Sequence, residues 1–319
     1  MKAPQDALVP APLLAVAAMV SIQLGSAVAK HLFDLLGLGA TASLRLLLAG
    51  ALALLLWRPA LRLERSSLPS ILGLGAAIAG MNFCFYAAID RIPLGMAVTI
   101  EFLGPLTVAA LGSRRPRDIL WVLLAALGVL LLTDSAGPIA WTGVLFAIAA
   151  GACWGAYIAC GTIVGKRTTG HDGLALAMAC GGILTLPVAL GTATPALFDP
   201  LVLLSLLAVA LLSSLLPHAL EMTVLRQIPA ATFGVLMSLM PAVAAAAGRV
   251  LLGETLDLTQ YAGIAVVVVA AAGAAYRPTP GGEFPPPRRR AARPRVSRGP
   301  AVSARTLVLT GPSRRETPP

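Results

Sequence analysis

Residues 92–116 read Ile92-Pro-Leu-Gly-Met-Ala-Val-Thr-Ile-Glu101-Phe-Leu-Gly-Pro105-Leu-Thr-Val-Ala-Ala-Leu-Gly112-Ser-Arg-Arg-Pro116. The stretch is apolar and long enough for a helix, yet it holds one carboxylate, which a proline follows four residues later. Pro105 has no N–H, so in a helix the carbonyl of Glu101 loses its hydrogen-bond partner. A charge and a free backbone acceptor in one turn are costly in hydrocarbon. Both groups therefore require protein or water around them.

Apolar segments of similar length recur along the whole chain. The mean hydropathy is +0.84 and only 12% of the residues are charged, values typical of a polytopic membrane protein rather than a soluble one. We expect an all-α integral membrane protein with about ten transmembrane helices. The predicted spans are residues 9–29, 38–57, 69–89, 93–112, 118–134, 139–160, 172–192, 200–224, 228–248 and 256–276.

Lysines and arginines are distributed unevenly between the connections on the two sides of the membrane. The richer set, leaving out the C-terminal tail, is Lys2, Arg58, Arg62, Arg65, Arg114, Arg115, Arg117, Lys166, Arg167 and Arg226. The poorer set is Lys30, Arg91 and Arg249. Cytoplasmic connections carry the excess of Lys and Arg. Both termini are therefore predicted to be cytoplasmic, which agrees with an even number of spans.

The net charge of +10 comes mostly from the C-terminal tail. Residues 277–319 hold ten arginines and two glutamates, a net +8, which leaves +2 for the rest of the chain. This Pro- and Arg-rich composition predicts a disordered cytoplasmic tail near anionic lipid headgroups. The membrane body has no basic stripe with interleaved aromatic residues, so nucleic acid is not an expected partner.

The two halves of the chain resemble each other at an offset of 136 residues. Matching pairs include Ile92-Pro93 with Ile228-Pro229, Pro105 with Pro241, and Gly112 with Gly248. Five spans in each half would turn the second copy upside down, which is the inverted-repeat plan of many secondary transporters. The sequence predicts a first five-helix repeat at residues 1–136 and a second at 137–276. Chance similarity between apolar segments is the alternative.

Four ionisable residues lie well inside predicted spans, namely Arg45, Glu101, His218 and Glu221. A charged residue near the bilayer centre costs about 2.5–3.5 kcal/mol on insertion scales, so it needs a compensating role. Glu101 lies roughly 12 Å along its span, at 1.5 Å per residue. A carboxyl at that depth can be neutral when dry and ionised when hydrated, as a proton-coupled carrier requires. The alternative is a structural Glu101, either always protonated or paired with Arg45.

His218 and Glu221 are three residues apart, so they share a helix face. Pro217 beside them frees the carbonyl of Ser213. The pair could relay protons or bind a polar substrate, and a structural hydrogen bond between helices is the alternative. No further ligand is near enough in the sequence to predict a metal site.

Gly104-Pro105 and Pro241 are predicted to kink the fourth and ninth spans. Kinked spans that contain glycine suit the wall of a cavity. A simple packing adjustment is the alternative, because prolines are frequent in transmembrane helices.

Several stretches together resemble the EamA type of the drug/metabolite transporter superfamily, and within it the threonine/homoserine exporter branch. They are Gly25-Ser-Ala-Val-Ala-Lys-His-Leu-Phe33, Leu44-Arg-Leu46, Gly80-Met-Asn-Phe-Cys-Phe-Tyr86, Ile92-Pro-Leu-Gly95, Glu101-Phe-Leu-Gly-Pro105, Ser113-Arg-Arg-Pro116, Ala150-Gly-Ala-Cys-Trp154 with Tyr157, Leu216-Pro-His-Ala-Leu-Glu-Met222, Thr232-Phe-Gly-Val-Leu-Met-Ser-Leu239 and Gly253-Glu254-Thr255. The resemblance runs from about residue 12 to 276, and the tail lies outside it.

This resemblance implies a bacterial inner-membrane carrier of ten helices in two inverted repeats, with no cofactor. It implies export of small amino acids such as threonine and homoserine, driven by proton antiport. Arg45, Glu101 and Glu221 match charged positions typical of the branch. Relatives often have Glu where this chain has Met240, within Ser238-Leu-Met240-Pro-Ala242. That departure leaves coupling and specificity open at this position.

Two other functions stay open. The same carrier fold could export another metabolite or a drug, because proteins with one fold can carry many cargoes. A membrane-embedded enzyme is the more distant alternative, since it would need clustered nucleophiles or metal ligands. His31, His171 and His218 lie in different segments, which argues against such a cluster. The sequence also leaves open whether the chain acts alone or as a homodimer.

Overall fold

The computed structural model describes residues 9–59, 67–111, 116–133, 140–168, 172–191, 194–228 and 230–275. All of them belong to one compact unit, Met1–Arg277. The predicted tail at 277–319 lies outside the described residues, as do several of the loop cations counted above.

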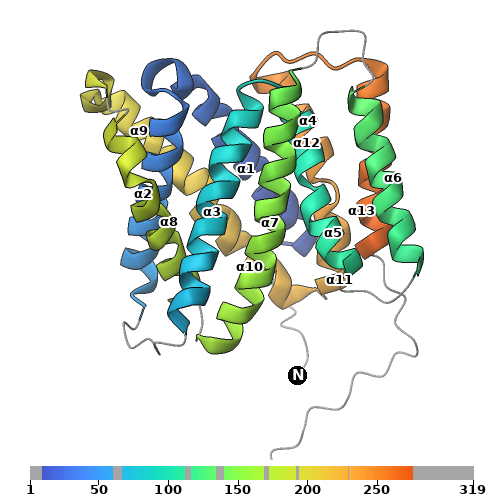
Figure 1. Cartoon of the computed structure of the whole chain (residues 1–319), viewed down its shortest axis with the longest axis horizontal. Coiled ribbons are helices and arrows are strands. Elements are labelled where there is room, and N and C mark those ends of the chain that lie inside the picture. Colours follow the sequence, from blue (N-terminus) through green and yellow to red (C-terminus); the bar gives the residue numbers. More distant parts are fainter. Residues whose placement is uncertain are drawn as a thin grey trace, which may run out of the picture. The chain divides into compact units, whose positions relative to one another are not determined.

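Every described element is a helix, which confirms the all-α prediction for this part of the chain (Figure 1). The elements are α1 (Ala11–Leu36), α2 (Leu38–Trp57), α3 (Leu68–Ile89), α4 (Leu94–Glu101), α5 (Leu103–Leu111), α6 (Pro116–Thr133), α7 (Trp141–Arg167), α8 (Asp172–Gly191), the 3₁₀ turn η2 (Pro195–Phe198), α9 (Pro200–Ala210), the π-turn η3 (Leu211–Leu215), α10 (Leu216–Gln227), α11 (Ala230–Met237), α12 (Met240–Leu251) and α13 (Leu258–Ala275).

These helices form the ten predicted spans. Eight segments are long and apolar enough to cross a membrane by their length and composition. Two shorter apolar helices, Leu94–Val108 and Ile119–Leu132, supply the other two. The chain is therefore a multi-pass membrane protein.

The first helix is longer than predicted. Its apolar stretch was expected to end at residue 29, but α1 continues to Leu36. The helix stops only at Gly37, whose φ of 78° lies in the left-handed region. Glycine adopts that conformation without a Cβ clash, so it ends the helix where the hydrophobic pattern could not. The added turns place Lys30 on a helix instead of in a loop.

The fourth and ninth spans are both broken shortly before their prolines. Phe102 separates α4 from α5, and Ser238 and Leu239 separate α11 from α12. Neither Pro105 nor Pro241 can donate the backbone hydrogen bond that an unbroken helix needs. The helices α4 and α11 have eight residues each and occupy equivalent positions at the offset of 136.

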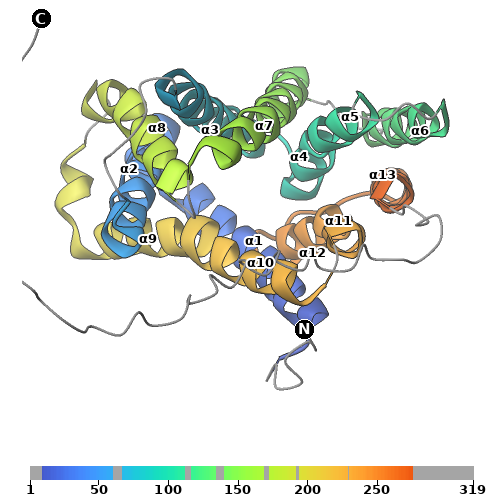
Figure 2. The same cartoon turned by 90° about the horizontal axis from the view of Figure 1, so that it is seen from below.

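Helices of the first half pack mainly against helices of the second half. The main pairs are α2 with α8, α3 with α7, α6 with α13, α1 with α10, and α4 with α12. Figure 2 shows α3, α7, α4 and α5 along one side and α10, α12 and α11 along the other. Small residues allow close crossings. A Cβ on Gly50 of α2, for example, would lie 2.9 Å from the Cα of Ala179 on α8.

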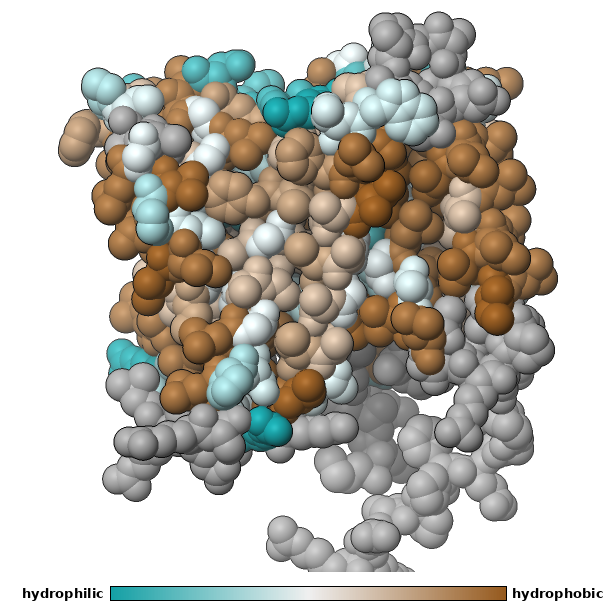
Figure 3. Space-filling view, viewed as in Figure 1, coloured by the Kyte–Doolittle hydropathy of each residue, from teal (hydrophilic) through white to brown (hydrophobic). Residues whose placement is uncertain are grey.

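The outer surface is apolar, as expected for helices that face lipid. Leucines and isoleucines stay well exposed on many helices, for example Leu55, Leu130, Leu145 and Ile183. Figure 3 shows a hydrophobic band on this face, with hydrophilic residues gathered above and below it. Such a band would be unstable in water, and it matches the hydrocarbon layer of a bilayer.

Candidate functional site

A cavity of about 220 Å³ lies inside the bundle, between helices of both halves. It is smaller than the roughly 300–1,000 Å³ typical of drug-sized pockets, so it suits a small metabolite. Its walls are Ile22, Gln23, Ser26, Arg45, Leu46, Ile78, Met81, Asn82, Phe85, Tyr86, Val98, Glu101, Trp154, Tyr157, Leu174, Met178, Ser213, Ser214, Pro217, His218, Glu221, Met237 and Met240.

Arg45 on α2 is held in the cavity wall by partners from two other segments. Its Nη1 donates to Oδ1 of Asn82 on α3. Its Nη2 donates to the carbonyl oxygen of Ser213 at 3.2 Å and to Oγ of Ser214 at 3.3 Å. Asn82 is fixed in turn, because its Nδ2 donates to the carbonyl oxygen of Ile78 at 2.8 Å. The guanidinium is therefore buried in a defined orientation.

The carbonyl that receives Arg45 is the one that the sequence predicted to be free. Pro217 has no N–H, so the carbonyl of Ser213 lacks its helical partner. Ser213 also lies in η3, the single π-turn between α9 and α10, and such turns are frequent at functional sites. On its other side the guanidinium lies over the ring of Tyr86, with Cζ 5.5 Å from the ring centroid.

Glu101 is the last residue of α4 and lines the same cavity, with 8% of its surface exposed. Among the described residues its carboxylate forms no hydrogen bond, and Arg45 is not within the 4.0 Å of an ion pair. Direct pairing of Glu101 with Arg45, one of the alternatives from the sequence, is therefore not the arrangement found. The freed backbone carbonyl of Glu101 packs against α7, where a Cβ on Gly151 would lie 2.7 Å from it.

His218 and Glu221 both face the cavity from α10, as their spacing predicted. Nδ1 of His218 lies 3.2 Å from the carbonyl oxygen of Ser214. Ser214 thus contacts Arg45 through its hydroxyl and His218 through its carbonyl. The cavity collects one guanidinium, one imidazole and two carboxyl groups from three different spans.

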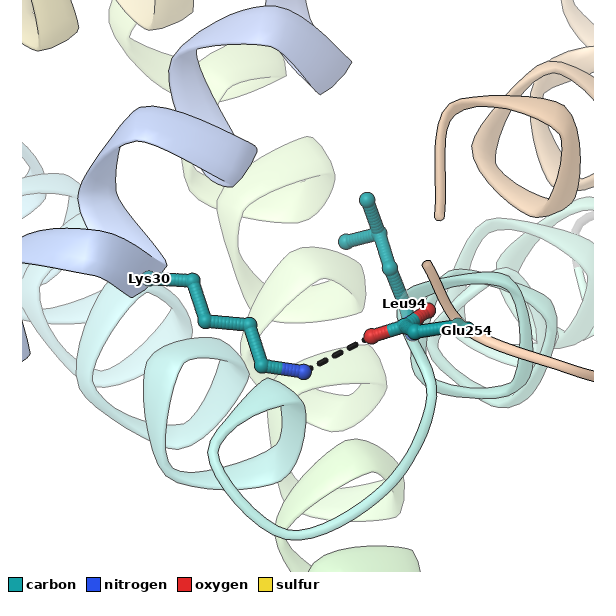
Figure 4. Close-up of polar contacts among 3 residues, drawn as sticks. All are labelled: Lys30, Leu94 and Glu254. Atoms are coloured by element: carbon teal, nitrogen blue, oxygen red, sulfur yellow. Dashed lines mark hydrogen bonds and ion pairs between the residues drawn. The ribbon is translucent and has the colours of Figure 1, made fainter. Parts of the chain in front are cut away.

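One end of the bundle is tied together by Glu254, in the connection between α12 and α13. Its Oε1 accepts from Nζ of Lys30 on α1 at 2.7 Å, and its Oε2 accepts from the backbone N–H of Leu94 at 2.8 Å (Figure 4). Leu94 is the first residue of α4, where a carboxylate is stabilised by the helix dipole. Glu254 therefore joins one segment of the second half to two segments of the first.

Sequence comparison decides the family. The profile of the EamA-like transporter family matches residues 141–276. The threonine/homoserine exporter RhtA of Salmonella typhimurium is 40% identical over 263 residues, which cover 80% of this chain and 88% of that protein. RhtA of Escherichia coli K12 is 40% identical over 260 residues, with the same two coverages. The chain belongs to the EamA-like transporter family.

A solved crystal structure supports the fold of this EamA-like transporter. It superposes with a TM-score of 0.57 over 82% of this chain and 94% of the other chain, at 16% sequence identity. The prediction of a transporter rather than an enzyme is confirmed by the family. Within the described residues no group of three or more His, Cys, Asp or Glu side chains could hold a metal ion.

The kink residues of this EamA-like transporter lie beside the cavity rather than in its wall. Gly104, Pro105 and Pro241 are at or next to the two helix breaks, but the cavity-lining residues at those breaks are Glu101, Met237 and Met240. Met240, where the resemblance led us to expect a glutamate, thus presents an apolar group to the cavity.

Three cavity residues were missed by reading only the ionisable side chains, namely Gln23, Asn82 and Tyr86. Each has a polar group inside an apolar span, which is itself costly in hydrocarbon. The same argument that singled out Glu101 would have found Gln23 and Asn82 if neutral amides had been included.

Proposed function

We propose that this EamA-like transporter exports small amino acids of the threonine and homoserine type by proton antiport across the bacterial inner membrane. The main supporting observation is that one small cavity between the two halves holds a fixed guanidinium and a carboxyl that has no hydrogen bond or ion pair among the described residues. A zwitterionic amino acid offers the complementary pair of charges. The two relatives named above are called threonine/homoserine exporters.

In this proposal Arg45 binds the carboxylate of the cargo. A guanidinium is well suited to this because its N–H groups form a rigid fork that matches carboxylate geometry. Asn82, Ser213 and Ser214 use the two Nη atoms, whereas the Nε of Arg45 is buried without a partner among the described residues. That edge of the guanidinium is available to a ligand.

Glu101 is the proposed site of proton coupling. It is buried in the cavity with no partner among the described residues, so protonation breaks no protein contact. Glu221 and His218 share the cavity and are candidates for binding the ammonium group or relaying the proton. Bound cargo and a proton on this carboxyl would then exclude each other, so the arrival of a proton would release the cargo.

We further propose that residues 1–136 and 137–276 are inverted repeats that move against each other. Two features support this: the coincident breaks of the fourth and ninth spans, and the reciprocal packing of α1 on α10 and α3 on α7. Transporters with such repeats open alternately to the two sides around a midplane site. The contacts of Glu254 with Lys30 and Leu94, which join the two halves at one end of the bundle, would then have to break when the cavity opens at that end.

We also propose that both termini lie on the cytoplasmic side. The excess of Lys and Arg on alternate connections supports cytoplasmic termini. Under that orientation the end tied by Lys30 and Glu254 faces the outside.

The test is export of labelled threonine and homoserine by the purified chain in proteoliposomes under an imposed pH gradient. We expect export that stops when a protonophore collapses the gradient. Glu101→Gln should insert normally, lose gradient-driven export and keep exchange of labelled for unlabelled cargo. Gradient-driven export by Glu101→Gln at the unsubstituted rate would reject the coupling role.

A different cargo on the same carrier is the second candidate. The apolar part of the wall, formed by Trp154, Met237 and Met240 among others, favours it, because these side chains suit a less polar metabolite. Competition of a metabolite panel against labelled threonine would separate the two functions. Strong competition by apolar metabolites, with none by threonine or homoserine, would favour this second candidate.

A further inference from the structure

The side chain of Gln23 is the least satisfied neutral polar group in the cavity wall. Gln23 lies in the middle of α1, lines the cavity and is 1% exposed. Neither its amide oxygen nor its amide nitrogen has a partner among the described residues. Burying a primary amide without hydrogen bonds is costly, and such groups are rare in folded proteins.

The polar neighbours of Gln23 on the same helix are satisfied. Ser21 Oγ donates to the carbonyl oxygen of Leu212 at 2.7 Å, and Ser26 Oγ donates to that of Ile22 at 3.0 Å. Gln23 lies between these two serines and makes neither kind of contact. An apolar side chain of similar length would therefore pack at this position as well as the amide does.

The hydroxyls of Tyr86 and Ser213, also in the cavity wall, are likewise buried without a partner among the described residues, but each leaves one polar atom unpaired, whereas Gln23 leaves two. The charged groups without a full set of partners differ from Gln23 in their chemistry. The free Nε of Arg45 carries positive charge and suits a carboxylate, and Glu101 suits an ammonium group or a proton. An amide is neutral and can donate one hydrogen bond while it accepts another. A hydroxyl group of the cargo has the same double capacity, whereas an aliphatic side chain has none.

We propose that Gln23 binds the side-chain hydroxyl of the exported amino acid and sets the preference for hydroxyl amino acids over aliphatic ones of the same shape. The inference rests on the proposed function, because it assumes amino-acid cargo in this cavity. It assigns to Gln23 a role in specificity, separate from the binding of the cargo's charged groups by Arg45 and Glu101.

A site built to hydrogen-bond a hydroxyl discriminates strongly against the analogue that lacks it. Valine has the shape of threonine but would leave the amide of Gln23 buried and unpaired. An apolar site, by contrast, rejects an added hydroxyl only weakly. Replacing the amide by an apolar group of similar length should therefore improve valine binding as well as weaken threonine binding.

The experiment measures how unlabelled threonine and valine compete with labelled homoserine for export in proteoliposomes. The unsubstituted chain should prefer threonine over valine by roughly tenfold or more, the discrimination that one neutral hydrogen bond supplies. Gln23→Met, which keeps the length and removes the amide, should reduce this ratio to about threefold or less. Leu13→Met, an apolar change on the exposed face of the same helix and away from the cavity wall, should leave the ratio unchanged.

The outcomes separate the inference from the proposed function. If neither homoserine nor threonine is exported by the unsubstituted chain, the proposed function fails and the inference fails with it. If export occurs but Gln23→Met keeps the full preference for threonine, the inference alone is wrong. Should Gln23→Met not be recovered from membranes, Gln23→Asn withdraws the amide by one methylene and must also lower the ratio. An unchanged ratio in Gln23→Asn would then overturn the inference.

Discussion

Breaking the tie between Lys30 and Glu254 should open the cavity toward the end of the bundle that Glu254 holds together. Glu254 holds Lys30 through one carboxylate oxygen and the N–H of Leu94 through the other. Three substitutions test the contributions of these two contacts separately. Lys30→Met removes the cation, Glu254→Gln removes the charge but keeps an acceptor for Leu94, and Glu254→Ala removes both contacts.

The magnitude follows from the geometry. At 2.7 Å and an effective dielectric constant of about 20, the attraction between the two charges is roughly 6 kcal/mol before desolvation. The side chains are 27% and 13% exposed, so both ions have lost much of their hydration. A charged hydrogen bond contributes about 1.5–3 kcal/mol net. A loss of about 2 kcal/mol from the closed state would raise the open population roughly 30-fold.

The assay is labelling of a cysteine in the cavity by a membrane-impermeant maleimide. Ser26→Cys introduces the target cysteine in the cavity wall. It is placed in a background in which the native cysteines Cys84, Cys153, Cys160 and Cys180 have been replaced by serine. Labelling is measured in right-side-out and in inverted vesicles. We expect the rate from the Lys30 end to rise roughly tenfold or more in Lys30→Met and Glu254→Gln, and further in Glu254→Ala, given the population shift above.

Asp90→Asn is the matched control. Asp90 and Arg91 form the second ion pair of the described residues, at 3.1 Å, but these neighbours in the sequence are 41% and 37% exposed. An exposed pair of this kind contributes little and joins no separate segments, so its loss should leave the labelling rate unchanged. The reasoning is refuted if the Lys30 and Glu254 variants label no faster than Asp90→Asn.

Three further predictions concern the cavity and its frame. Arg45→Lys should weaken the competition of threonine with labelled homoserine roughly tenfold or more. A lysine cannot keep the planar contacts to Asn82 and Ser213 and also present a donor edge to the cargo. An unchanged inhibition constant would argue against carboxylate binding at Arg45. Pro217→Ala restores a backbone N–H that competes with Arg45 for the carbonyl of Ser213. The affinity for threonine should therefore fall, while thermal stability in detergent is kept or raised. Equal affinity would mean that this carbonyl does not position Arg45. Gly151→Ala should lower the free energy of unfolding by about 1–3 kcal/mol, because its Cβ would lie 2.7 Å from the carbonyl oxygen of Glu101. The control is Gly165→Ala on the same helix, where no atom of the described residues lies within 4 Å of the new Cβ, so stability should not change. Equal melting temperatures of the two variants would contradict this close crossing.

Local physical rules predicted the spans and the helix breaks from the sequence. Hydropathy gave ten spans, and the missing N–H of Pro105 located the break in the fourth span within a few residues. The same rule predicted the free carbonyl of Ser213 that Arg45 now uses. The spans depend on continuous apolar segments, and the breaks and free carbonyls depend on residues four positions apart, so a local sequence pattern is sufficient to find them.

Contacts between distant segments could not be predicted in this way. Arg45 and Ser213 are 168 residues apart, and Lys30 and Glu254 are 224 apart. Lys30 lay in a predicted loop, because the apolar pattern ends before the helix does. The helix continues to Leu36 and ends only at Gly37, so Lys30 lies on α1, from which it reaches Glu254. Contacts between side chains on distant helices depend on where each helix ends, and the hydrophobic pattern of the sequence does not predict those ends.

Two prolines create the same defect in two spans, but the protein resolves the two defects differently. The carbonyl freed by Pro217 is taken by Arg45, which fixes the cation. The carbonyl freed by Pro105 meets the bare Cα of Gly151 instead, so no side chain is drawn toward Glu101. A cation that binds cargo benefits from being fixed, since the cost of orienting it is met in advance. A carboxyl that exchanges a proton benefits from having no protein partner, because an ion pair would hold it ionised. We infer that this difference suits Arg45 to binding and Glu101 to coupling.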